Sequence, residues 1–127
     1  MNNVLVDTSA WIDFLRSSSG ETGDRIAELI RLDRAYITGP VIAELLHGVR
    51  NNKEAARLNL LLETIPCLEI TSGDWLTTGN SLRKLRQKGV TIPLTDVLIA
   101  TVAARNSMAV LTLDKHFLHL SVTCLGC

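Results

Sequence analysis

The most informative absence in this chain is that of a long apolar run. No stretch approaches the roughly 18 consecutive apolar residues that a membrane-spanning helix needs. The first three residues, Met1-Asn2-Asn3, carry no basic segment and no cleavage site typical of a secretion signal. We therefore expect a cytoplasmic protein that makes no contact with a membrane.

Cysteine is also scarce, with Cys67, Cys124 and Cys127 as its three occurrences. An odd number of cysteines gives no even framework of disulfides. Cys124 and Cys127 have the Cys-x-x-Cys spacing, but a structural zinc site needs four ligands and no second pair exists. We interpret these residues as incidental thiols.

An excess of charge of either sign is missing too, because 13 Lys and Arg balance 13 Asp and Glu. The chain as a whole therefore has no electrostatic footprint for a polyanionic ligand. The densest basic cluster is Arg83-Lys84-Leu85-Arg86-Gln87-Lys88. It is either the solvated, cationic C-terminus of a helix, which we favour, or a set of phosphate contacts.

What the chain does have is the composition of one compact domain. Its 127 residues are 46% hydrophobic and 20% charged, which suffices for a buried core and argues against disorder. We see no linker, and expect a single domain spanning residues 1–127.

Hydrophobic periodicity predicts strands that alternate with helices. Strands are expected at Asn3–Val6, Ala35–Thr38, Cys67–Ile70, Ala109–Leu113 and Ser121–Cys124. Helices are expected around Trp11–Leu15, over Asp24–Leu32, after Pro40, over Lys53–Thr64, from Ser72 until Gly89, and over Thr95–Arg105; Ser17–Gly20 is expected to be a loop. This alternation indicates an α/β fold with a mostly parallel central sheet.

The long helix from Ser72 has a predicted inner face of its own. Ser72 is expected to cap it and Gly89 to end it. The residues expected to face inward are Trp75, Leu76, Gly79, Leu82 and Leu85.

Four acidic residues stand where predicted elements begin or end. Asp7 closes the first strand, Asp114 ends the fourth, Asp96 opens the last helix, and Glu44 lies on the helix after Pro40. The carboxyl ends of parallel strands lie along one edge of a sheet, where ligands bind. Carboxylates gathered there repel one another unless a cation holds them, and Mg²⁺ or Mn²⁺ prefers such hard oxygen ligands. The pattern predicts a metal-dependent site that cleaves phosphodiesters.

Each of these acids also has a simpler interpretation when taken singly. Asp7 and Asp96 could cap helices, and Asp114 could be an ordinary turn residue. Glu44 lies far around its helix from the apolar stripe, which is typical of a solvated glutamate. It would reach the site only if its helix ran along the edge of the groove.

Four segments of the chain, in order, resemble the motifs of the PIN-domain ribonucleases. They are Val4-Leu5-Val6-Asp7-Thr8-Ser9-Ala10-Trp11-Ile12, Pro40-Val41-Ile42-Ala43-Glu44-Leu45-Leu46-His47-Gly48, Pro93-Leu94-Thr95-Asp96-Val97-Leu98-Ile99-Ala100 and Leu111-Thr112-Leu113-Asp114-Lys115-His116-Phe117. Within that family the chain most resembles the VapC-type toxins of VapBC toxin–antitoxin pairs. The resemblance implies a three-layer α/β/α PIN-like fold.

The same resemblance implies a site and a reaction. Asp7, Glu44, Asp96 and Asp114 would be the catalytic residues of an Mg²⁺- or Mn²⁺-dependent endoribonuclease. Asp7 and Asp96 would be the principal metal ligands, and Glu44 and Asp114 would complete the pocket, directly or through water. Other residues that could orient a ligand or water are Thr8 or Ser9, and Thr112.

The resemblance further implies an RNA substrate, a cognate antitoxin protein and a homodimer. The mechanism needs no histidine as a base, and only His116, beside Asp114, is kept as a candidate substrate contact. A phosphatase of the haloacid-dehalogenase type would want an aspartate where Ser9 stands. The alternative that remains is a catalytically silent PIN-like module that binds RNA or protein.

Overall fold

A five-stranded sheet, parallel throughout, forms the centre of the molecule. The computed structural model describes residues 2–17 and 20–127. The strands are β1 (Val4–Val6), β2 (Ala35–Thr38), β3 (Cys67–Leu68), β4 (Ala109–Leu111) and β5 (Cys124–Leu125). Their order across the sheet is β3-β2-β1-β4-β5, and each neighbouring pair is parallel. The predicted α/β class with a mostly parallel sheet is confirmed.

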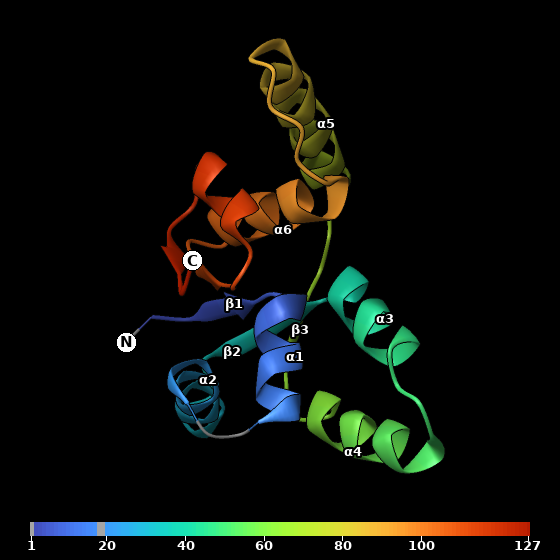
Figure 1. Cartoon of the computed structure of the whole chain (residues 1–127). Coiled ribbons are helices and arrows are strands. Elements are labelled where there is room, and N and C mark those ends of the chain that lie inside the picture. The colour runs from blue at the N-terminus through green and yellow to red at the C-terminus, as the bar shows by residue number, and fades with distance from the viewer. Residues whose placement is uncertain (1, 18–19) are drawn as a thin grey trace.

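Helices cover both faces of this sheet (Figure 1). They are α1 (Thr8–Arg16), α2 (Glu21–Arg31), α3 (Gly39–His47), α4 (Asn52–Leu62), α5 (Ser72–Gln87), α6 (Leu94–Arg105) and the short 3₁₀ helix η1 (Lys115–His119). Figure 1 shows α1, α2 and α4 below the sheet and α6 above it, with α5 projecting away from the body. These are the three α/β/α layers that the resemblance implies.

The strand order places a natural binding crevice at the end of β1. The chain moves from β1 outward to β2 and β3, and then returns to the other side of β1 to form β4 and β5. Helices leave β1 and β4 on opposite sides at this reversal, and α/β sheets bind ligands at such a position. Any residue that directly follows β1 or β4 therefore faces the crevice.

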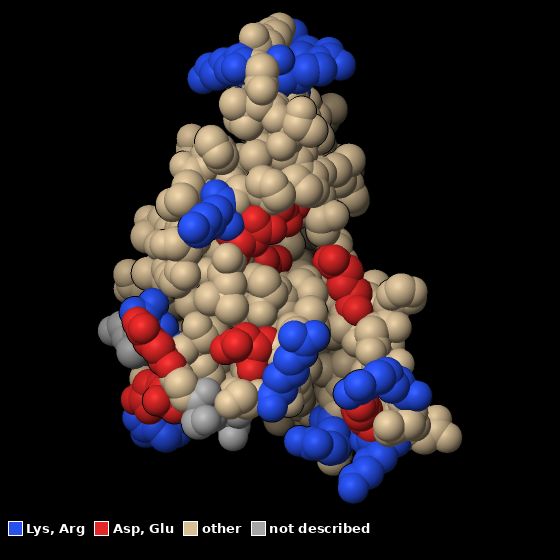
Figure 2. Space-filling model, in the orientation of Figure 1, with Lys and Arg blue, Asp and Glu red and all other residues tan. Residues whose placement is uncertain are grey.

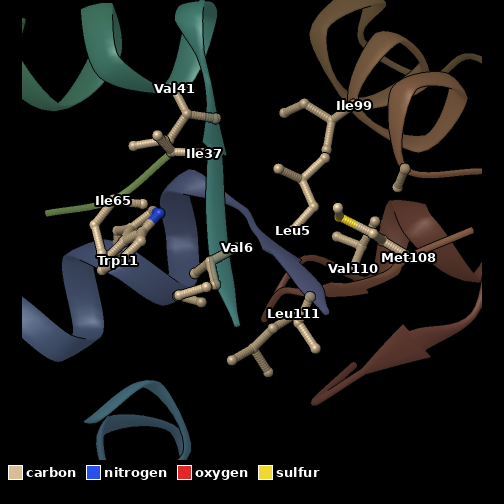
Figure 3. Close-up of a cluster of buried hydrophobic side chains, with 14 of the residues drawn as sticks. Leu5, Val6, Trp11, Ile37, Val41, Ile65, Ile99, Met108, Val110 and Leu111 are labelled. Atoms are coloured by element: carbon tan, nitrogen blue, oxygen red, sulfur yellow. The ribbon is translucent and has the colours of Figure 1, made fainter. Parts of the chain in front are cut away.

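The core lies on both sides of β1. Its side chains alternate between the two faces of the sheet, and Figure 3 shows Leu5 pointing toward Ile99 of α6 while Val6 points to the side where Trp11 lies. All four of these side chains are at most 1% exposed. The strand that carries Asp7 is thus anchored in both halves of the core.

The inner face of α5 differs from the prediction. Trp75 and Leu76 are 50% and 70% exposed, and Gly79 is exposed too, whereas Asp74 and Thr78 are buried. The helix packs its polar face on α6 because Asp74 forms an ion pair with Arg105, which an apolar-periodicity argument cannot detect.

The capping of two helices also differs from the prediction. Thr71, not Ser72, caps α5: its hydroxyl accepts from the Asp74 N–H at 3.2 Å, and its own N–H donates to Asp74 at 2.9 Å. The predicted end of α5 at Gly89 is confirmed by a φ of 76° there, which favours glycine. Asp7 precedes α1 but makes no side-chain capping hydrogen bond.

The remaining differences are local. The last strand is β5 at Cys124–Leu125 rather than Ser121–Cys124, because the chain still bends at Ser121 and Val122. Cys124 and Cys127 lie side by side at the C-terminal end, with their Cα atoms 6.3 Å apart. Of the predicted Ser17–Gly20 loop, Ser18 and Ser19 lie outside the described residues. No helix within the described ranges is both long and apolar enough to cross a membrane.

Candidate active site

The four acidic residues of the sequence motifs lie on four different elements around the crevice. Asp7 directly follows β1, Asp96 stands on the first turn of α6, Asp114 precedes η1 after β4, and Glu44 lies on α3. Figure 2 shows acidic side chains at mid-height on this face, below the part of the surface that α5 forms. Asp7 is 4% exposed, whereas Glu44 is exposed.

Two hydroxyl groups hold the Asp7 carboxylate. Thr112 donates to Asp7 Oδ2 at 2.9 Å, and Ser9 donates to the same oxygen at 3.2 Å. The Asp7 N–H also donates to the Leu111 carbonyl of β4 at 2.9 Å. Both strands at the crevice therefore fix the position of Asp7, through its side chain and its backbone.

Ser9 and Thr112 are themselves fixed by the backbone that follows β4. The Leu113 N–H donates to the Ser9 hydroxyl at 2.9 Å, and the Asp114 N–H donates to the Thr112 hydroxyl at 3.0 Å. The two hydroxyl groups lie 3.1 Å apart. These contacts link Asp7 to Asp114, so the two acids are held in one network.

Asp96 is a largely buried carboxylate without a hydrogen-bond partner on Oδ2 among the described residues. Its side chain is 13% exposed. Burial, and then the negative charges of Asp114 and Asp7, raise the pKa of Asp96 to about 6. A carboxylate in this position is stabilised in its charged form by any cation that reaches Oδ2.

Asp114 titrates in the opposite direction from its neighbour. Burial would raise the pKa of Asp114, but hydrogen bonding from His116 and the charge of its imidazole hold that pKa below its ordinary value. The His116 N–H donates to Asp114 Oδ1 at 2.9 Å, and His116 Nδ1 lies 3.0 Å from the same oxygen.

His116 is closer to the acids than the sequence interpretation suggested. Its Nδ1 lies 3.3 Å from Asp96 Oδ2 as well as near Asp114. The sequence shows that His116 lies close to Asp114 in the chain. Its contact with Asp96 depends on how η1 packs against α6, which the sequence does not show. His116 is thus a member of the acidic cluster in addition to a candidate substrate contact.

Glu44 lies at the rim of this cluster. The Thr8 hydroxyl donates to Glu44 Oε1 at 3.1 Å, which joins the start of α1 to α3. The helix is anchored by Val41 and Leu45, which are buried, so that Glu44 projects from its exposed side. This is the placement along the edge of the groove that a role for Glu44 requires.

The residues present fit a hard divalent cation. Donor atoms of Asp96, Asp114 and His116 all lie within 4.8 Å of one another. Carboxylate oxygens are the ligands that Mg²⁺ prefers, and Mn²⁺ accepts both these oxygens and an imidazole nitrogen. The buried Oδ2 of Asp96 has no hydrogen-bond partner, although His116 Nδ1 lies 3.3 Å away, and it is the atom that such an ion would satisfy.

Comparison with known proteins agrees with this architecture. The family model of the PIN domain matches residues 4–122. The chain is 26% identical over 118 residues to VapC ribonuclease Mb1587 of Mycobacterium bovis, covering 90% of this chain and 88% of that one. Ribonuclease VapC11 of Mycobacterium tuberculosis matches with the same values.

Solved structures show the same fold at lower sequence identity. The DNA-bound VapBC of Salmonella typhimurium superposes with a TM-score of 0.85 at 19% identity, covering 100% of both chains. The VapBC2 of Rickettsia felis, bound to a promoter DNA fragment, superposes with a TM-score of 0.82 at 20% identity, covering 96% of both chains.

Proposed function

This chain belongs to the PIN domain family, and we propose that it is a metal-dependent endoribonuclease, the toxin of a type II toxin–antitoxin pair. The catalytic residues in this proposal are Asp7, Glu44, Asp96 and Asp114. The observation that carries it is the buried Asp96 carboxylate, which has no hydrogen-bond partner on Oδ2 and lies beside two further acids. Its relatives named as VapC ribonucleases support the reaction class.

Asp7 and Asp96 would be the principal ligands of Mg²⁺ or Mn²⁺, and Glu44 and Asp114 would complete the pocket, directly or through water. An ion held by these carboxylates would supply a more acidic water as the nucleophile and a positive charge beside the phosphate oxygens. Ser9 and Thr112 keep Asp7 oriented, as the supporting hydrogen bonds of metal ligands generally do. The Thr8 hydroxyl does the same for Glu44.

The partners in this proposal are RNA as substrate, a cognate antitoxin and a second copy of the chain. Support for an antitoxin comes from the similar solved structures, several of which are VapBC or toxin–antitoxin complexes. An antitoxin segment that covered the acidic crevice would block access of RNA to Asp96.

Cleavage of structured RNA by the purified protein tests the proposal. Assays should show cleavage with Mg²⁺ or Mn²⁺ and no cleavage with EDTA. Asp96→Asn removes a charge at nearly constant volume, and we expect it to lower the rate by roughly 10³-fold or more, as losing a main electrostatic contributor does. Circular dichroism would verify that the variant is folded.

A matched control is Asp13→Asn, which changes an acid on α1 that is not one of the four motif acids. It should cleave at the wild-type rate. If the wild type cuts no RNA with either metal, titration calorimetry with Mn²⁺ distinguishes the alternatives. Mn²⁺ binding without cleavage, or no binding at all, would favour the catalytically silent module that binds RNA or protein.

A further inference from the structure

The C-terminal end of α5 carries four cations without acidic partners. They are Arg83, Lys84, Arg86 and Lys88, all exposed, and Figure 2 shows them as the basic group at the top of the molecule. No Asp or Glu occurs between Asp74 and Asp96. Within the described part of the chain, none of the four forms an ion pair. The arginines that do form ion pairs are Arg25, Arg31, Arg50 and Arg105.

Like charges crowd along the surface at the end of this helix. Lys84 and Lys88 are spaced i,i+4, and Arg83 and Arg86 are spaced i,i+3. Each such pair costs roughly 0.2–0.5 kcal/mol. The helix dipole favours Lys84 and Arg86 in the last turn by roughly 0.3–1 kcal/mol each, which offsets this cost. A polyanion on this surface would remove the repulsion.

The cationic end of α5 adjoins a hollow beside α6. Lys84 and Lys88 line a hollow of about 590 Å³ between α5 and α6, together with the hydroxyl-bearing side chains of Thr77, Ser81, Thr101 and Ser121. Two other lining residues adjoin the candidate active site in the chain. Val97 follows Asp96, and His119 belongs to the same 3₁₀ helix as His116.

We propose that the end of α5, with the hollow below it, binds the phosphate backbone of a folded RNA whose scissile bond lies in the acidic crevice. The inference rests on the proposed ribonuclease function and adds where the substrate is held. The net charge of the chain is +0. The RNA is therefore attracted by the local cluster of cations on α5 and not by an overall positive charge. Since α5 projects from the body (Figure 1), an RNA stem reaches its end and a linear fragment of a few nucleotides does not.

The test compares two variants that each remove four positive charges, from +0 to −4. The first is Arg83→Gln/Lys84→Gln/Arg86→Gln/Lys88→Gln, in which glutamine preserves helix propensity. The control changes four exposed cations on α2 and α4: Arg25→Gln/Arg31→Gln/Lys53→Gln/Arg57→Gln. Fluorescence anisotropy would measure their affinity for a labelled stem-loop RNA in EDTA, so that binding is observed without cleavage.

We expect the α5 variant to bind the stem-loop roughly 30-fold more weakly than wild type, and the slope of log K against log salt to fall by about 2 to 3. The control should lose less than about threefold. Equal affinities and slopes for the two variants would overturn the proposal, because net charge alone would then explain binding. If the quadruple variant does not fold, the pairs Lys84→Gln/Lys88→Gln and Arg83→Gln/Arg86→Gln answer the same question.

Cleavage with metal distinguishes failure of this inference from failure of the proposed function. Weak binding by the α5 variant should raise the KM for the stem-loop and leave kcat unchanged, with no effect on a linear fragment of a few nucleotides. An unchanged KM would reject the docking surface while the ribonuclease stands. Binding through α5 without cleavage by the wild type would reject the ribonuclease and retain the surface.

Discussion

Two buried carboxylates in this molecule have opposite environments. Asp74 is 2% exposed and receives two hydrogen bonds from Arg105, at 2.7 and 2.8 Å, and these hold its pKa below the ordinary value. Asp96 has Asp114, Asp7 and the His116 imidazole as its neighbours, and burial with the two acids raises its pKa to about 6. Burial is therefore not what separates them. Asp74 is neutralised within the chain, whereas Asp96 is left for a ligand to neutralise.

Breaking the pair at Asp74 should give the largest change in stability. Asp74→Asn leaves the Arg105 guanidinium without its counter-charge. Breaking a buried pair costs roughly 3–5 kcal/mol, and since Arg105 is 42% exposed, we expect a loss of about 2 to 3 kcal/mol. Urea denaturation would measure it. An unchanged free energy of unfolding would contradict the assignment of Asp74 as structural.

The pH dependence of stability should separate the two acids by sign. Asp74, with its lowered pKa, stabilises the fold above about pH 4, and that stability is lost as the pH falls through its folded pKa. Asp96, with its raised pKa, has the opposite effect. The metal-free fold should lose roughly 2 kcal/mol as the pH rises from about 4 to about 6, because ionised Asp96 is unfavourable there.

Asp96→Asn isolates the second of these effects. In EDTA the variant should be more stable than wild type by about 2 kcal/mol at pH 7.5 and by almost nothing at about pH 4. Urea denaturation at the two pH values measures this difference. A variant that is less stable than wild type at both values would show that the Asp96 carboxylate is satisfied by the protein.

Thr112→Val tests whether the network around Asp7 prepares it for a ligand. The substitution removes the hydroxyl that donates to Asp7 and accepts from the Asp114 N–H. Losing such a supporting contact typically weakens metal affinity by about 10- to 100-fold. Calorimetric titration with Mn²⁺ would detect it. Ser121→Ala, which changes a hydroxyl of the hollow beside α5, is the control and should leave Mn²⁺ affinity unchanged.

Thr38→Val should have the smallest effect of the series. The Thr38 hydroxyl is buried and has no hydrogen-bond partner among the described residues, so it is a neutral counterpart of Asp96. Valine has the same shape and leaves no polar group unsatisfied, and we expect a stability within about 0.5 kcal/mol of wild type or slightly higher. Thermal denaturation would measure it. A loss above about 2 kcal/mol would indicate that the hydroxyl makes a contact of its own.

The sequence predicted the sheet well because its strands are short apolar runs that end at turn residues. It also placed Asp7 and Asp114 at the correct edge, since the carboxyl ends of parallel strands share one side. The prediction of the inner face of α5 was wrong for a physical reason. Asp74 is buried because it pairs with an arginine 31 residues away in the chain. Hydrophobic periodicity reports the spacing of apolar residues in the sequence, and it cannot detect an ion pair between two helices.

The electrostatic difference between Asp74 and Asp96 was equally hidden. Both are acids in the first turn of a helix. Only the packed molecule reveals that one meets a guanidinium and the other meets two carboxylates. The assignments of Asp7, Glu44, Asp96 and Asp114 as metal ligands stay predictions until metal binding is measured.

The attachment of α5 has a consequence for how this fold diversifies. The helix packs mainly on α6, while Asp7 and Asp114 are held by the strands and hydroxyl groups at the centre of the sheet. Local opening of α5 would leave that centre intact, so its amides should exchange with solvent faster than those of β1 and β4. On the proposed function, substitutions at its outer end would change how RNA is held without disturbing the positions of Asp7 and Asp114.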